Sequence, residues 1–256
     1  MKDGLKRSGR VLAPSVFTMC NMCCGFFAIM SAHIGDFTAA GTAILGGIVF
    51  DMLDGRVARW VHGESSFGVE FDSLADFLTF CVAPATVMCA LLLKDYGFFG
   101  YASAFLFALC GGLRLARFNA VSQAGKGSKT HFQGLPTPAA AGLLASFVLL
   151  YEIVERGGGP KTMGFVMHQI PNLAGLGPVL MVTLSFLMVS NVPYGAFKQP
   201  DMLRPHNIKR LVAVGVTLTL LYIYPQNAIF LLFLLYVASG LTGLVFRGRR
   251  RAERHH

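Results

Sequence analysis

The feature that most constrains this chain is a series of eight apolar stretches, each about as long as a membrane-spanning helix. Such a helix needs about 20 predominantly apolar residues. The 256-residue chain is 54% hydrophobic and only 14% charged, unlike an ordinary soluble domain. The stretches cover approximately residues 15–34, 37–61, 69–93, 98–118, 136–154, 165–192, 208–224 and 227–246. The sequence therefore predicts an all-α, polytopic membrane helix bundle with about eight transmembrane helices.

The distribution of Lys and Arg predicts the topology, because short cytoplasmic loops are enriched in these residues. With the N-terminus inside, all of the 22 basic residues except Lys94, Arg156 and Lys161 fall on the cytoplasmic side. We expect both termini in the cytoplasm and the protein in the cell (inner) membrane. The formal net charge of +9 is scattered over helix ends near anionic headgroups, which argues against a nucleic-acid partner.

No repeat, low-complexity stretch or long linker divides the chain. We expect one membrane domain over residues 1–256. Its parts are a basic cytoplasmic N-terminus (1–14), the helix bundle (15–246) and a basic cytoplasmic tail (247–256). The six cysteines lie within apolar stretches. Since the pair Cys20 and Cys23 has no second pair or suitably spaced His, packing is the expected role.

Four carboxylates lie within two consecutive apolar stretches, where charge is expensive and indicates function. Asp51 and Asp54 are three residues apart, and Asp72 and Asp76 are four apart, so each pair shares one helix face. A turn near residues 62–66 would bring the two helices together as a hairpin. Four crowded carboxylates repel one another unless a cation is present. An all-oxygen set favours Mg²⁺ or Mn²⁺ over zinc.

Two other interpretations of the carboxylates stay open. They could pair with Arg56 and Arg59 only to make burial tolerable, but two arginines cannot neutralise four carboxylates. They could also form a cation or proton pathway in a transporter. The later stretches carry no matching pair of acidic residues to continue such a pathway.

From Asp51 to Asp76 the chain reads D-x2-D-G-x2-A-R-x8-G-x3-D-x3-D, with eight fixed residues at set spacing. This pattern resembles the complete signature of the CDP-alcohol phosphotransferase family. The resemblance implies a six-helix core with two divalent cations, Mg²⁺ or Mn²⁺, and a homodimer. It implies that Asp51, Asp54, Asp72 and Asp76 bind metal, with Asp76 also the general base. It further implies that Gly55, Ala58 and Arg59 line the CDP pocket, and Gly68 beside them would let a ligand approach the backbone.

Three further stretches, at residues 14–25, 114–119 and 134–142, are similar to the phosphatidylserine synthase branch of that family. This similarity implies transfer of a phosphatidyl group from CDP-diacylglycerol to L-serine, within a membrane of lipid partners. Arg114, Arg117 and Asn119 could bind the zwitterionic acceptor, or the arginines could simply anchor the helix end at the headgroups. A sister transferase with another acceptor, glycerol phosphate or inositol phosphate, or with an archaeal ether-lipid donor, is the alternative within the enzyme class.

The remaining expectations concern the first helix and two loops. Thr18 and Asn21 lie one turn apart and are expected to contact the CDP-lipid, although hydrogen bonding between helices is the common role of such residues. Residues 134–138 are expected to form a rigid turn into the fifth helix, because two prolines restrict it. Residues 122–132 form a loop that could close over the cleft.

Overall fold

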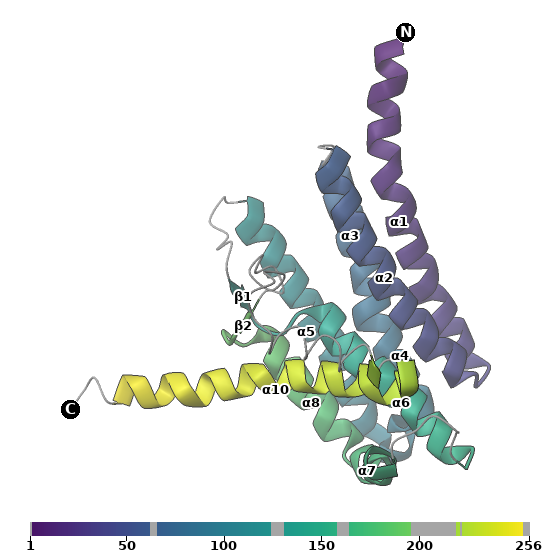
Figure 1. Ribbon diagram of the computed structural model, residues 1–256, viewed down its shortest axis with the longest axis vertical. Helices are drawn as coiled ribbons and strands as arrows, with labels where there is room; N and C mark the ends of the chain where they lie inside the picture. The colour runs from purple at the N-terminus through teal and green to yellow at the C-terminus, as the bar shows by residue number, and fades with distance from the viewer. Residues whose placement is uncertain are drawn as a thin grey trace.

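The computed structural model is a bundle of α-helices with one small sheet. It describes residues 2–61, 66–123, 131–157, 164–195, 219–220 and 222–252. Figure 1 shows α2 and α3 running alongside α1, while α10 crosses the other helices at a steep angle. The elements are α1 (Lys2–His33), α2 (Phe37–Val61), α3 (Ser66–Asp76), the π-helix η1 (Phe77–Val82), α4 (Ala83–Leu91), the 3-10 helix η2 (Leu93–Tyr96), α5 (Gly97–Gln123), β1 (His131–Gln133), α6 (Thr137–Glu155), α7 (Gly164–Gly175), α8 (Gly177–Val189), β2 (Pro193–Gly195) and α10 (Pro225–Ala252).

The outer surface of the bundle is apolar. Phe98 and Phe99 at the start of α5 are 80% and 77% exposed. A water-soluble protein seldom exposes clusters of such side chains, so this surface fits contact with lipid. Five described segments are long and apolar enough to cross a membrane, namely Val16–His33, Phe37–Val57, Phe67–Leu91, Leu93–Val121 and Thr137–Glu155. The chain is an integral membrane protein, and the predicted all-α membrane bundle is confirmed.

The C-terminal half differs from the expected series of eight spans. The stretch expected at 165–192 is two helices, α7 and α8, which meet at a large angle at Leu176 (Figure 1). Pro178 lies in the first turn of α8, where it has no N–H to donate to the carbonyl oxygen four residues earlier, so one continuous helix cannot pass through this point. The apolar parts of α8 and α10 are shorter than a full span. Most of the stretch expected at 208–224 lies outside the described residues.

The third span changes its helix type directly after Asp76. There α3 gives way to η1, which buries Thr79, Phe80 and Cys81, and α4 follows with Pro84 in its first turn. A π turn holds about one residue more than an α turn and often occurs at functional sites. The extra residue alters which side chains after Asp76 face the interior of the bundle.

Most of α6 is buried, and it packs against α2, α4, α7 and α10. Its entry is the rigid turn that the sequence predicts, since Gly134 has a φ of +84° and Pro136 is the residue before the first turn of α6. The backbone N–H of Gly134 donates to the carbonyl oxygen of Val192 at 2.9 Å. The segment before α6 is thereby joined to the segment after α8.

A two-stranded antiparallel sheet strengthens this connection. In its register Phe132 lies opposite Tyr194, whose buried hydroxyl donates to the carbonyl oxygen of Val237 on α10 at 3.3 Å. Burial, with a smaller effect of Tyr236, raises the pKa of Tyr194 to about 12, so the hydroxyl keeps its proton and can donate. Strands of three residues are too short for a periodic sequence signal, and the sequence did not predict them.

Candidate functional site

The carboxylates singled out by the sequence lie on the facing helices α2 and α3. Asp51, Asp72 and Asp76 each offer a carboxylate oxygen, and these three oxygens lie within 4.8 Å of one another. The spacing along each helix and the packing of both helices against α1 produce this convergence. The turn expected to close the hairpin, at residues 62–65, lies outside the described residues.

Asp54 lies beside this group and is held from a third helix. Its side chain is 6% exposed, and its Oδ2 accepts a hydrogen bond from the hydroxyl of Thr18 on α1. Asp54 is near enough to Asp51 and Asp72 for its charge to act on both. We call Asp51, Asp54, Asp72 and Asp76 the acidic cluster. Its carboxylates come from α2 and α3, and α1 donates a hydrogen bond to it.

The acidic cluster has the donor set that a divalent cation requires. The Oδ1 atoms of Asp54 and Asp72 are buried and have no hydrogen-bond partner among the described residues. No described basic side chain forms an ion pair with the cluster, although the side chain of Arg59 is not among those described. Buried carboxylates left this way are unfavourable without a counter-charge. Hard oxygen ligands fit a divalent cation such as Mg²⁺ or Mn²⁺.

Thr18 and Asn21, expected at the CDP-lipid, face the acidic cluster. Beside the contact of Thr18 with Asp54, the side-chain N–H of Asn21 donates to Oδ1 of Asp76 at 3.0 Å. Asn21 is fully buried, and its Oδ1 has no hydrogen-bond partner among the described residues. A role for α1 in orienting carboxylates is thus added to the expected substrate contact, which stays a prediction.

The glycines and arginine of the signature lie at the same end of the hairpin. Gly55 follows Asp54 on α2, and a Cβ atom there would meet open space, which leaves room for a ligand beside the backbone. Gly68 lies in the first turns of α3. Ala58 and Arg59 belong to the last turns of α2, and their side chains are outside the described part. Their role in binding CDP stays a prediction.

The three polar residues expected at the acceptor have different environments on α5. Arg117 donates to Oδ1 of Asn191 at 2.9 Å, and Asn119 donates to Oγ of Ser73 at 2.8 Å. Sequence reasoning missed both partners, because contacts between residues 74 and 46 positions apart leave no local pattern. Arg117 and Asn119 therefore brace neighbouring segments.

Arg114 is the member of this group that faces the carboxylates. Its Nη1 donates to Oγ1 of Thr137 at 3.1 Å, while its buried Nε has no hydrogen-bond partner among the described residues. Its charge acts on Asp76, with no ion pair between them. A half-buried guanidinium with an available donor beside a carboxylate cluster can receive an anionic group of a substrate.

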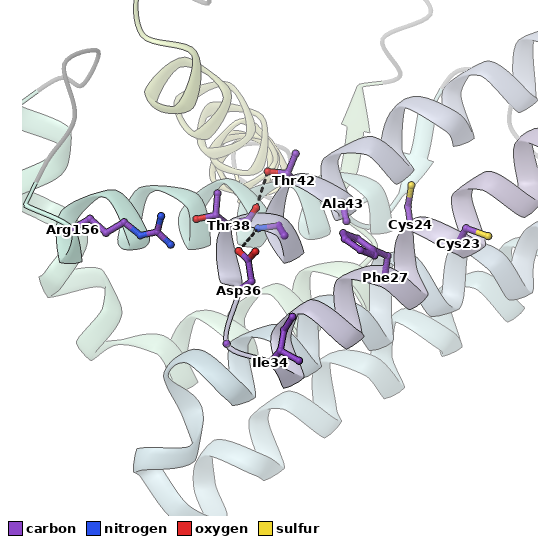
Figure 2. Close-up of a pocket in the computed structure, with 11 residues that line it drawn as sticks. Cys23, Cys24, Phe27, Ile34, Asp36, Thr38, Thr42, Ala43 and Arg156 are labelled. Carbon is purple, nitrogen blue, oxygen red and sulfur yellow. Dashed lines mark hydrogen bonds between the residues drawn. The ribbon is translucent and has the colours of Figure 1, made fainter.

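A cavity of about 890 Å³ lies elsewhere, at the junction of α1 and α2. Figure 2 shows Asp36, Thr38 and Arg156 around it, with Phe27 and Cys24 along its wall. None of the four aspartates lines it, and its last residue on α2, Ala43, precedes Asp51 by eight residues, about 12 Å along a helix. We therefore place the candidate site at the acidic cluster and not in this cavity.

Comparison with known proteins agrees with the geometry. The family described as CDP-alcohol phosphatidyltransferase matches residues 11–187. A protein from Helicobacter pylori named CDP-diacylglycerol–serine O-phosphatidyltransferase is 33% identical over 92% of each chain. A protein of the same name from Bacillus subtilis is 31% identical over 73% of this chain and 91% of its own. A protein from Methanothermobacter thermautotrophicus named archaetidylserine synthase is 31% identical over 76% of this chain and 74% of its own.

Proposed function

Because this chain belongs to the CDP-alcohol phosphatidyltransferase family, we propose that it transfers a phosphatidyl group from CDP-diacylglycerol to L-serine, giving phosphatidylserine and CMP. In this reaction a bond forms between the serine hydroxyl oxygen and the phosphorus that carries the diacylglycerol. The bond from that phosphorus to the CMP oxygen breaks. The convergence of carboxylate oxygens from Asp51, Asp72 and Asp76 within 4.8 Å, on the signature residues of the family, is the observation that carries the proposal.

The acidic cluster has two tasks in this proposal. Asp51, Asp54, Asp72 and Asp76 hold divalent cations, two ions of Mg²⁺ or Mn²⁺. When bound, such ions neutralise pyrophosphate charge and stabilise the leaving group. Asp76 is also the general base that takes the proton of the acceptor hydroxyl, since a carboxylate within hydrogen-bond reach can do so. Gly55, Ala58, Arg59 and Gly68 bind the CDP moiety, with Thr18 and Asn21 at its border.

Arg114 is the proposed contact for the carboxylate of serine. Its Nε has no hydrogen-bond partner among the described residues, which supports this role, and so does the effect of its charge on Asp76. The serine hydroxyl would then lie close to the group that deprotonates it. Arg117 and Asn119 hold Asn191 and Ser73 and are proposed to shape the acceptor pocket.

The setting of the reaction is part of the proposal. The distribution of basic residues supports a site on the cytoplasmic face of the cell membrane, with both termini cytoplasmic. The single membrane domain over residues 1–256, surrounded by membrane lipids, would act as a homodimer. The length and apolar character of the five segments are consistent with this setting.

The relatives support serine more strongly than they support one lipid donor. The names of the relatives from Helicobacter pylori and Methanothermobacter thermautotrophicus indicate different lipids, while both names contain serine. An ether-lipid donor is therefore the leading alternative, followed by another acceptor alcohol. A cation transporter is less well supported, because it would require polar groups along a path through the membrane.

The experiment is CMP release by the purified protein with CDP-diacylglycerol and Mn²⁺ or Mg²⁺, with and without L-serine. We expect release that depends on serine and stops with EDTA. Parallel reactions replace serine with glycerol phosphate or inositol phosphate, and CDP-diacylglycerol with its archaeal ether analogue. Release with another alcohol only would overturn serine as acceptor. Ion flux into sealed vesicles, with no CMP release by a folded sample, would overturn the transferase.

A further inference from the structure

Hydrogen bonds connect the π-helix η1 to Asp76 through α1. The hydroxyl of Thr79 donates to the backbone carbonyl oxygen of Asn21 at 2.9 Å. The side-chain N–H of Asn21 donates to Oδ1 of Asp76 at 3.0 Å. Thr79 and Asn21 are both fully buried, so water does not compete for the bond between them.

Close packing of three helices holds Thr79 in this position. A Cβ atom at Gly25 of α1 would overlap Oγ1 of Thr79 and lie 2.8 Å from its Cα. A Cβ atom at Gly47 of α2 would lie 2.5 Å from Cγ2 of Thr79 and 3.0 Å from Oδ1 of Asn21. Thr79 thus occupies the space that two glycines leave open. The glycines let α1 and α2 approach η1 closely enough for its hydroxyl to reach Asn21.

The unpaired atom of Asn21 indicates that the side chain is not present for stability alone. Its Oδ1 is buried without a hydrogen-bond partner among the described residues, and an apolar residue of similar size would avoid that penalty. The orientation of the amide is chemically determined, because its carbonyl oxygen would repel the carboxylate of Asp76. The bond to Oδ1 of Asp76 restricts rotation of that carboxylate.

We propose that Asn21 is a positioning residue for Asp76, and that Thr79 holds Asn21 in place for this task. This proposal rests on the proposed function, in which Asp76 binds metal and accepts the hydroxyl proton. Asn21 orients the carboxylate, and Thr79 sets where Asn21 lies along α1. Residues that donate hydrogen bonds to metal ligands commonly fix the orientation of those ligands.

The first test separates positioning from substrate contact. We expect Asn21→Ala to lower kcat by about 10–100-fold, with the KM for CDP-diacylglycerol changed by less than about threefold. Mn²⁺ affinity, measured by paramagnetic resonance titration without substrate, should fall by about tenfold. Ser31→Ala, which truncates another buried polar residue of α1, is the matched control and should leave all three unchanged. A raised KM with unchanged kcat and Mn²⁺ affinity would instead make Asn21 a substrate contact and overturn the proposal.

The second test uses two substitutions of Thr79 with opposite expectations. Thr79→Ser keeps the hydroxyl and loses the methyl group near Gly47, so kcat and Mn²⁺ affinity should stay within about threefold of the wild type. Thr79→Val keeps the branched shape and loses the hydroxyl, so both should fall as in Asn21→Ala. A packing role gives the reverse order, with Ser impaired and Val normal, and that order would overturn the proposal.

The design distinguishes failure of this inference from failure of the proposed function. Asp76→Asn gives the residual turnover with which the other variants are compared in each assay. If the wild type released no CMP with serine, the proposed function would fall. The Mn²⁺ titrations of the Asn21 and Thr79 variants would still decide whether these residues orient Asp76, because they require no turnover.

Discussion

The two ends of the α1–α2 pair carry carboxylates in opposite circumstances. At the end where the helices join, Oδ1 of Asp36 accepts from the backbone N–H of Ala39 at 2.9 Å, and Glu152 pairs with Arg156 at 2.9 Å. At the other end, the carboxylates of the acidic cluster approach one another without a described basic partner. The cavity of about 890 Å³ lies at the first end and not at the second.

This difference shows that buried polar atoms without hydrogen-bond partners identify a functional site better than cavity volume does. Asp36 caps a helix, a structural task that needs no ligand. The buried Oδ1 atoms of Asp54 and Asp72 have no partner in the described part, so a ligand must supply the missing interactions. In a membrane protein, lipid chains can fill an open apolar cavity, whereas they cannot satisfy a carboxylate.

The strongest test exchanges one carboxylate at each end for an amide. Asp51→Asn should lower kcat/KM for CMP release by at least about 1000-fold, since metal binding supplies several kcal/mol of transition-state stabilisation and 1.36 kcal/mol corresponds to tenfold. Asp36→Asn keeps an oxygen that can cap the helix and should change kcat/KM by less than about threefold. Equal losses in the two variants would contradict the division between a structural and a functional end.

The cations at the two ends provide a test of intermediate size. Arg114→Gln should raise the KM for serine by about 10–100-fold, because a hydrogen bond to a charged group contributes about 1.5–3 kcal/mol. The KM for CDP-diacylglycerol should change little. Arg156→Gln is the control at the other end and should have almost no effect, since its partly exposed ion pair with Glu152 contributes about 0–1 kcal/mol. An unchanged KM for serine in the Arg114 variant would remove Arg114 from the acceptor site.

Two adjacent glycines of α2 give the smallest expected effect and test the packing behind the acidic cluster. Gly47→Ala would place a Cβ atom 2.5 Å from Cγ2 of Thr79, and such overpacking costs about 1–3 kcal/mol. A Cβ atom at Gly46 would have an ordinary 3.7 Å contact with Sγ of Cys24. Thermal unfolding in detergent should therefore show a lower Tm for Gly47→Ala than for Gly46→Ala. Equal Tm values would show that the three-helix junction relaxes freely.

The sequence predicted the parts of this molecule that depend on local pattern. Apolar length identified the helices around the site, and the spacing of Asp51, Asp54, Asp72 and Asp76 indicated that carboxylates would converge, as three of them do. The rigid turn at residues 134–138 followed from its prolines and is confirmed. The loop at residues 122–132, for which closure over the cleft was left open, lies largely outside the described residues, although His131 begins β1.

The parts that sequence could not predict depend on contacts across the bundle. Thr79 and Asn21 are 58 residues apart, and no period of the sequence relates them. Pro178 was a visible signal for the division of 165–192 into α7 and α8. The prediction of a single span relied on apolar length alone and did not use it. The π-helix η1 had no such signal, because a single extra residue in a turn does not disturb an apolar stretch.

That single extra residue has an evolutionary consequence. Insertions within transmembrane helices are generally harmful, since each one rotates everything beyond it by about 100°, one residue of a 3.6-residue turn. In η1 the wide turn takes up an additional residue between Asp76 and Pro84. Lineages of this protein can therefore differ by one residue in this stretch while the spacing from Asp51 to Asp76 stays constant. A gap at this position in an alignment of homologous sequences would mark a change in helix type and not a loss of the site.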